Sequence, residues 1–170
     1  MRVLGIDPSS RATGFGVIEY DEAAASVLSH GTIKPAARLP LYRKLGEIKI
    51  RLDEIIDAYE PEDVAVENPF YAQNIKTAIT LGQVRGAILV SVASHGCSLY
   101  EYSPLEIKKA VTGYGQAEKG QVNVMVRTLL RLQELDLEPD ASDALATAYC
   151  HLNIRLFQKK LKESGWQEGR

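Results

Sequence analysis

Short stretches rich in β-forming residues dominate the first part of the chain. Residues 2–7, about 13–19 and about 26–33 have this character, and glycines at positions 14, 16 and 31 punctuate them. Strands of this length that are separated by turn residues are typical of β-hairpins. The pattern therefore predicts an antiparallel meander of three strands.

From Leu41 onward the pattern changes to a helical one. Apolar residues recur at steps of three and four, and this places them on one face of a long helix that ends near Pro61: Leu45, Ile48, Leu52, Ile55, Ile56 and Tyr59. Residues 64–67 predict a fourth strand. A second helix is marked by Ala78, Leu81, Val84, Ile88 and Val92. Residues 99–102 predict a fifth strand, so the sheet is expected to be mixed.

Signals for helix ends organise the second half of the chain. Residues 103–106 (Ser-Pro-Leu-Glu) form a capping box, in which the serine and the glutamate satisfy free amides at the start of a helix. Residues 113–116 interrupt this helix, and another is defined by Val122, Met125, Leu129 and Leu132. A final helix is expected from about Asp140 to about Leu161. The predicted fold class is α/β, a mixed five-stranded sheet flanked by helices.

Length and composition predict one domain. A chain of 170 residues with 45% hydrophobic residues can bury one sizeable core, and no linker-like segment indicates a second. We expect this domain to cover residues 1–158. Residues 159–170 lack core positions and are expected to form a flexible charged tail.

Membrane, secreted and zinc proteins are not favoured. Cys97 and Cys150 have no partner cluster, and no signal peptide is expected before the first strand, which together favour free thiols in a cytoplasmic protein. No apolar run is expected to reach the roughly 20 residues that cross a bilayer. The three histidines show no spacing suited to zinc: His30, His95 and His151.

The formal net charge of −2 argues against a uniformly basic protein that coats nucleic acid. Local charge still decides binding, and six basic residues are candidates for a basic rim: Arg85, Lys108, Lys119, Lys109, Arg127 and Arg131. The alternative is that they are ordinary solvated charges on helices.

Four carboxylates carry the strongest chemical signal. Asp7 and Glu67 each end a predicted strand, while Asp140 and Asp143 open the alanine-rich final helix. Magnesium prefers oxygen ligands and retains several waters, so a few carboxylates around one cavity suffice to hold it against substrate phosphates. The four residues predict a site for two Mg²⁺ ions, for which Mn²⁺ can substitute, and metal-dependent hydrolysis of a phosphodiester.

Simpler interpretations exist for two of these residues. Asp7 lies in Asp-Pro-Ser-Ser, which is also a good turn sequence. Asp140 is suited to capping the final helix. The spacing of Asp140 and Asp143 places both carboxylates on one helix face, where their repulsion is costly unless a cation lies between them. Glycines in residues 4–18 are interpreted as allowing the first hairpin to pass close to a bound phosphate.

Five segments in order resemble the bacterial crossover junction endodeoxyribonuclease RuvC family: LGIDPSSRATGFGVI (4–18), AVENPF (65–70), LGQVRG (81–86), AEK (117–119) and DASDALA (140–146). The similarity covers about residues 1–157. It implies a ribonuclease H-like fold, a homodimer, magnesium, and paired symmetrical nicks that resolve a four-way Holliday junction. It also implies cooperation with the branch-migration complex RuvA-RuvB.

The same resemblance implies roles for individual residues. The family's metal-binding carboxylates correspond to Asp7, Glu67, Asp140 and Asp143. Phe70 corresponds to an aromatic near the junction centre, with core packing as the alternative, and Lys108 and Lys119 correspond to lysines near the scissile strand. Lys119 is expected to assist catalysis through its charge, and Arg85 is expected to contact the DNA backbone or an interface. Ser9 departs from the family, which commonly has glycine there; a positive φ at this position would strain serine.

The second predicted helix is also a candidate dimer interface. Gly82 and Gly86 lie one turn apart and would let a partner helix approach, with Leu81, Ile88 and Leu89 supplying apolar contacts. The alternative is that this face packs on the protein's own sheet. Two other functions are less favoured. An ATP-dependent kinase or chaperone domain of this fold needs a second lobe, and a junction-binding protein that does not cleave needs no set of four carboxylates.

Overall fold

The structure is a computed structural model that describes residues 1–21, 24–68, 74–133 and 137–164. Five strands form one sheet in the order β3-β2-β1-β4-β5. β1 and β2 pair antiparallel, as do β2 and β3, whereas β1 with β4 and β4 with β5 are parallel. The predicted mixed sheet is confirmed. The strands are β1 (Arg2–Asp7), β2 (Thr13–Tyr20), β3 (Ala25–Ile33), β4 (Asp63–Glu67) and β5 (Ser98–Tyr102).

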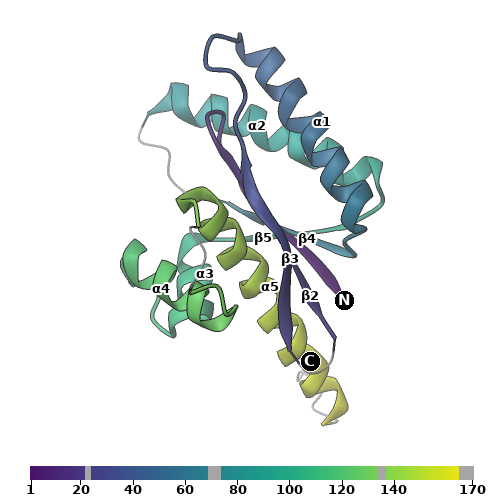
Figure 1. Ribbon diagram of the computed structural model, residues 1–170, viewed down its shortest axis with the longest axis vertical. Helices are drawn as coiled ribbons and strands as arrows, with labels where there is room; N and C mark the ends of the chain where they lie inside the picture. Colours follow the sequence, from purple (N-terminus) through teal and green to yellow (C-terminus); the bar gives the residue numbers. More distant parts are fainter. Residues whose placement is uncertain (22–23, 69–73, 134–136, 165–170) are drawn as a thin grey trace, which may run out of the picture.

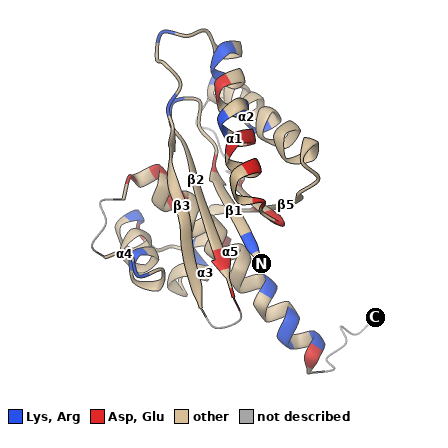
Figure 2. Cartoon of the chain, turned by 45° about the vertical axis from the view of Figure 1, so that its right-hand side comes forward, with Lys and Arg blue, Asp and Glu red and all other residues tan. Residues whose placement is uncertain are grey.

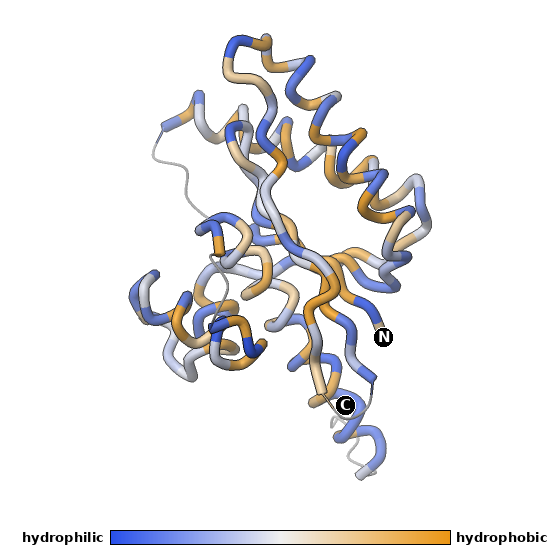
Figure 3. Tube along the Cα trace, viewed as in Figure 1, coloured by the Kyte–Doolittle hydropathy of each residue, from blue (hydrophilic) through white to orange (hydrophobic). Residues whose placement is uncertain are grey.

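Helices cover both faces of the sheet (Figure 1). One face carries α1 (Leu41–Tyr59) and α2 (Ile75–Ser94), and the other carries α3 (Pro104–Thr112), α4 (Lys119–Leu129) and α5 (Pro139–Glu163). Each face therefore has its own hydrophobic core. The central strand β1 contributes to both cores, because Val3 faces α5 while Leu4 and Ile6 face α1 and α2. Figure 3 shows this hydrophobic centre along the strands.

The helix ends agree with the sequence signals except around α4. The capping box at Ser103 is present, with the Ser103 amide donating to Glu106 Oε2 at 2.8 Å. α4 begins at Lys119, earlier than the first marker residue Val122, because Glu118 and Gln121 form a second capping box. It ends at Leu129, so the prediction that Leu132 is helical was wrong. Arg131 has a φ of 57°, and this left-handed conformation ends the helix.

α2 has an apolar face on each side. Val84 and Ile88 are buried in the core beside α1, so the expectation that Ile88 faces a partner was wrong. The opposite side carries Ile75, Ile79 and Val90, which are exposed. Cβ atoms added at Gly82 and at Gly86 would meet nothing within 4 Å. These glycines therefore do not pack on the protein's own sheet, and that alternative is wrong.

This two-sided composition also corrects the expectation about membrane-length segments. α2 has 20 residues and a mean hydropathy of 1.3, which makes it long and apolar enough to cross a bilayer by length and composition alone. One such helix is weak evidence, because core helices of globular proteins pass the same test. α5 runs to Glu163, into the segment expected to be a tail, and residues 165–170 lie outside the described residues.

Candidate active site

The four carboxylates come from three elements that meet at one edge of the sheet. Asp7 ends β1 and Glu67 ends β4, and these strands are parallel neighbours with Ile6 opposite Val66. Their carboxyl ends therefore lie side by side. Asp140 and Asp143 belong to the first turns of α5, which packs on the sheet over β1 and β2. The structure thus brings these three segments together at one edge of the sheet, and their role as a metal site stays a prediction.

Glycines in the first hairpin allow α5 to approach this closely. A Cβ at Gly14 would lie 1.9 Å from the carbonyl oxygen of Asp140, and one at Gly5 would lie 2.1 Å from that of Ala144. Because any side chain at these positions would collide with the backbone of α5, both must be glycine. Gly14 also pairs with Asp7 across the hairpin. Gly14 thus accommodates the helix that carries Asp140 and Asp143, and the close passage of a phosphate along the hairpin stays a prediction.

Three of the four carboxylates line a small pocket, and Asp140 is not part of its lining. Its volume is about 160 Å³, and its lining includes Asp7, Glu67, Asp143, Lys108 and Lys119. A larger hollow of about 620 Å³ lies between β3 and α1, but it contains none of the predicted site residues. The smaller pocket is lined by three of the predicted carboxylates together with both predicted lysines.

Mutual repulsion and burial shape the electrostatics of this pocket. Burial raises the pKa of Asp7 to about 8, and the negative charges of Glu67, Asp143 and Asp140 add to this shift. Burial and the charge of Asp143 also raise the pKa of Glu67. The positive charge of Lys119 lowers both values. The site is thus an acidic cluster with too little positive charge of its own, and a bound cation would relieve the repulsion.

The donor set fits a hard divalent cation, since it consists of carboxylate oxygens alone. Within the described parts of the chain, no three His, Cys, Asp or Glu side chains lie close enough to hold an ion as they stand. The charge of Asp143 nevertheless raises the pKa of both Asp7 and Glu67, which shows that these three carboxylates share one electrostatic environment. Bringing them closer together would cost repulsion, and a cation would compensate that cost.

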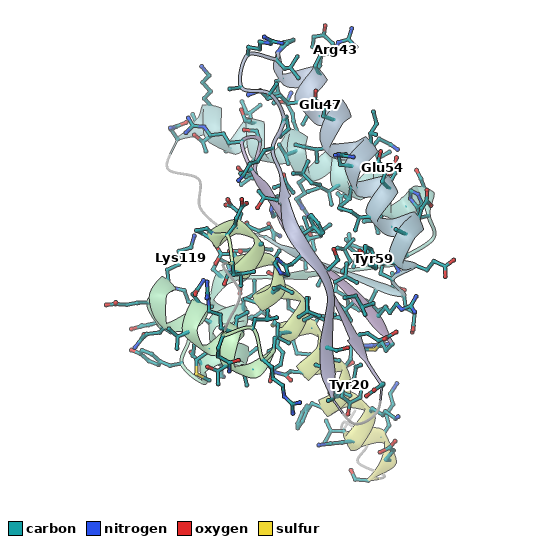
Figure 4. The ribbon with its side chains drawn as sticks, viewed as in Figure 1. Tyr20, Arg43, Glu47, Glu54, Tyr59 and Lys119 are labelled. Atoms are coloured by element: carbon teal, nitrogen blue, oxygen red, sulfur yellow. The ribbon has the colours of Figure 1, made fainter. Side chains whose placement is uncertain are left out.

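Lys119 occupies the acidic side of the pocket. Its Nζ lies 2.7 Å from Oδ2 of Asp143, and Figure 4 labels it where it leaves the start of α4 beside α5. The hydrogen bond to Asp143 raises the pKa of Lys119. Lys108 lines the same pocket from α3. Both lysines predicted to lie near the reacting strand are thus at the carboxylates.

The alternative role of Asp140 as a helix cap was wrong. The residue that precedes the helix is Glu138, and Pro139 occupies the first helical position. The carboxylate of Glu138 instead accepts hydrogen bonds from Lys34, at 2.8 Å, and from Thr32. Asp140 lies inside the first turn, where its charge still favours the helix dipole.

The basic residues that were candidates for a DNA-binding rim do not all lie together. Arg85 of α2 donates to Glu101 Oε1 at 2.7 Å, on the α2 side of the sheet, and Arg127 donates to Asn123 within α4. Figure 2 shows basic residues spread over several helices. Phe70 lies outside the described residues.

Ser9 causes no strain in the turn after Asp7. Glu60 and Arg131 are the non-glycine residues with positive φ in the described segments, and Ser9 is not among them. Its hydroxyl accepts a hydrogen bond from the Arg11 amide at 3.2 Å, so serine stabilises the turn through its side chain.

Comparisons with known proteins agree with this geometry. The family described as crossover junction endodeoxyribonuclease RuvC matches residues 3–151. A protein of that name from Syntrophomonas wolfei is 43% identical over 169 residues, covering 99% of this chain and 98% of the relative. Another from Chlorobaculum parvum is 48% identical, covering 90% of this chain and 82% of the relative.

Solved structures show the same fold. Thermus thermophilus RuvC in complex with Holliday junction substrate superposes with a TM-score of 0.87 at 34% identity, covering 93% of this chain and 96% of that one. The yeast mitochondrial Holliday junction resolvase has a TM-score of 0.69 at 11% identity, covering 95% and 83%, and so supports the fold alone. The fold is the predicted ribonuclease H-like one. By sequence and by structure, this chain belongs to the crossover junction endodeoxyribonuclease RuvC family.

Proposed function

We propose that the protein is a Holliday junction resolvase that hydrolyses phosphodiester bonds at the carboxylate pocket. The observation that carries the proposal is the convergence of Asp7, Glu67 and Asp143 on one pocket with Lys108 and Lys119. Acidic groups suit a cation and the lysines suit the phosphates of DNA. Membership of a family whose members are named endodeoxyribonucleases supports the reaction, and a relative solved with a Holliday junction supports the substrate.

Asp7, Glu67, Asp140 and Asp143 would hold the divalent cation. The oxygen donors favour Mg²⁺, with two ions per subunit and Mn²⁺ as a substitute. When bound, such ions supply Lewis-acid chemistry, which activates water and stabilises the leaving oxygen. The four carboxylates would hold the ions next to the pocket in which we place the scissile phosphate. Burial of Asp7 keeps bulk water from screening this cluster.

The two lysines would act on the DNA directly. The side chain of Lys119 is 74% exposed, whereas that of Asp143 is 18% exposed, so the lysine can move while the aspartate stays anchored. We infer that Lys119 leaves Asp143 when a cation arrives and then places its charge on the reacting phosphate. Lys108 contributes to holding the strand in the pocket.

A homodimer would supply the second active site that paired nicks require. The exposed side of α2 is the proposed interface, because Ile75, Ile79, Gly82, Gly86 and Val90 follow one another at steps of three and four. Two such faces are self-complementary about a two-fold axis. An apolar stripe of this length on a helix marks a contact site.

The cellular setting is proposed from the family resemblance. The resolvase would act on DNA in the cytoplasm together with the branch-migration complex RuvA-RuvB. Co-sedimentation with RuvA-RuvB on a four-way junction tests this partnership, and independent sedimentation of the proteins on the same junction would contradict it.

A nicking assay tests the proposed reaction. A labelled four-way junction and a linear duplex of the same sequence are each incubated with the protein, with Mg²⁺ or with a chelator. The expected result is paired nicks in the junction with Mg²⁺ alone and little cleavage of the duplex. Junction binding without cleavage under all metal conditions would instead identify a binding protein.

A further inference from the structure

A buried chain of hydrogen bonds links α5 to β4 and β5 away from the pocket. Tyr102 Oη lies 2.7 Å from His151 Nδ1, and His151 Nε2 lies 2.9 Å from Asp63 Oδ2. The side chains of His151 and Asp63 are 0% and 6% exposed. Arg155 Nε approaches the same Asp63 oxygen at 3.3 Å from the solvent side. The proposed reaction uses none of these groups.

Burial determines which atoms of these hydrogen-bonded side chains carry protons. Burial lowers the pKa of His151 and raises that of Tyr102, so the imidazole is neutral and the phenol keeps its proton. A neutral imidazole has one donor and one acceptor. The phenol therefore donates to Nδ1, and Nε2–H donates to the Asp63 carboxylate. Every member has a partner, which fixes the orientation of the ring.

The hydrogen-bonded residues Tyr102, His151 and Asp63 and the carboxylate pocket share two elements, β4 and α5. Asp63 and Glu67 are four residues apart on β4, so they point to the same sheet face about 13 Å apart. Asp143 and His151 are eight residues apart on one face of α5, about 12 Å along its axis. Helix and strand thus meet at two matched points, His151 with Asp63 and Asp143 with Glu67.

The two points have opposite electrostatic character. Asp143 and Glu67 line the same small pocket, so their like charges repel each other. His151 and Asp63 attract each other through a hydrogen bond. Sliding α5 along β4 would relieve the repulsion but break the hydrogen bond. The buried bond therefore opposes the displacement that the acidic cluster favours.

We propose that Tyr102, His151 and Asp63 are positioning residues that set the axial register of α5 against β4, and thereby the spacing of Asp143 from Glu67. The inference rests on the proposed metal-dependent function, because that spacing matters only if both carboxylates hold a cation. Residues outside the ligand shell that orient ligands commonly change metal affinity by about 10- to 100-fold when they are replaced.

Tyr102→Phe is the decisive variant, since it removes one hydroxyl and keeps the ring in the core. The matched control is Ile48→Val on α1, which is fully buried in the other core and makes no contact with the hydrogen-bonded residues. Losing one methylene and losing one buried hydrogen bond lower the melting temperature by comparable amounts. Any difference in cation binding is then not a consequence of lower stability.

Mn²⁺ binding is measured by calorimetry without DNA, and nicking is measured as a function of Mn²⁺ concentration. We expect Tyr102→Phe to weaken Mn²⁺ binding about 10-fold or more, relative to Ile48→Val, and to regain nicking at raised Mn²⁺. Asp63→Asn keeps an oxygen that accepts from His151, and it should bind Mn²⁺ more tightly than Tyr102→Phe. Equal Mn²⁺ affinity in Tyr102→Phe and Ile48→Val would overturn the inference.

The two proposals fail in different ways. If the unaltered protein neither binds Mn²⁺ nor nicks the junction, the proposed function fails. If it does both, and Tyr102→Phe matches the control, only the positioning role fails.

Discussion

Nζ of Lys119 and Oδ2 of Asp143 lie 2.7 Å apart, so the acidic pocket carries a counter-ion supplied by a different helix. The lysine is the exposed partner and the aspartate the anchored one. A cation held by Asp143 would compete with Lys119 for this carboxylate. Lys119 would then be free to contact a phosphate.

Lys119→Ala is therefore expected to separate cation binding from cleavage. Without the competing ammonium group, Mn²⁺ should bind more tightly. Cleavage should nevertheless slow by about 10²-fold, since a positioned charge on the reacting phosphate is lost. Calorimetry and single-turnover nicking measure the two effects. Lys160→Ala, which removes the same charge from an exposed position of α5, is the control. Weaker Mn²⁺ binding in Lys119→Ala would contradict the competition.

Replacing any one of Asp7, Glu67, Asp140 or Asp143 by the matching amide is expected to abolish nicking. Loss of cation-derived stabilisation of the transition state means a rate drop of roughly 10²- to 10³-fold or more. Junction binding in chelator should persist, because contacts to phosphate come from other residues. Rates and gel-shift affinities measure both quantities. Normal cleavage by Asp140→Asn would show that Asp140 is not one of the catalytic carboxylates.

Asp7→Asn has a further expected effect on stability. The buried carboxylate of Asp7 is surrounded by acidic groups, so the neutral amide should raise the melting temperature in chelator at pH 8. For a domain of this size, each kcal/mol corresponds to roughly 2–4 °C. The stabilisation by Mg²⁺ that we expect in the unaltered protein should be absent from this variant. An Asp7→Asn variant that melts lower in chelator would argue against the repulsive cluster.

The raised pKa of Asp7 also predicts how stability depends on pH. Its folded-state value is about 8 against an ordinary 3.8, so between these values the folded protein holds a proton that the unfolded chain has released. Without metal, this group makes the protein less stable as pH rises through that window. Mg²⁺ needs the ionised form, so its stabilising effect should be larger at pH 8 than at pH 6. Thermal melts at pH 6 and at pH 8, with and without Mg²⁺, measure this pH dependence. The same melts of Asp7→Asn show how much of it comes from Asp7.

Much of the fold was predictable because its signals are local. The capping box at Ser103 and the apolar spacing along residues 41–59 specify a helix start and a helix face without reference to other segments. The placement of the carboxylates was predictable for a related reason. Asp7 and Glu67 end strands, and the ends of parallel strands meet at one edge of a sheet.

Contacts between distant segments could not be predicted in the same way. Gly14 reads as a turn residue in sequence, and only the packed fold shows the backbone of Asp140 against it. His151 has no metal-ligand spacing, and its partners Tyr102 and Asp63 are 49 and 88 residues away. The hydrogen bonds that Arg85 donates to Glu101 and that Lys34 donates to Glu138 likewise depend on tertiary placement. The sequence indicates such a network only through a polar residue at a core position of a helix, as His151 is in α5.

The exposed side of α2 leads to a prediction about assembly. Cβ atoms at Gly82 and Gly86 would meet nothing in the protein itself, so Gly82→Leu with Gly86→Leu should preserve the folded monomer. Leucine should even favour the helix, since glycine is the weaker helix former by roughly 0.8–1 kcal/mol per residue. The same side chains would hold a partner helix away. We expect a monomer that is at least as stable as the unaltered chain and nicks one strand slowly.

Sedimentation and a two-strand nicking assay measure the two outcomes. A cruciform plasmid distinguishes them, because one nick relaxes it whereas paired nicks linearise it. Gly46→Leu is the matched control, since a Cβ at Gly46 of α1 also meets nothing within 4 Å and lies away from the apolar stripe. That variant should dimerise and linearise the plasmid normally. If the unaltered protein sediments as a monomer yet linearises the plasmid, the α2 interface is wrong. The pairing of cuts would then have to come from two molecules that meet on the DNA alone.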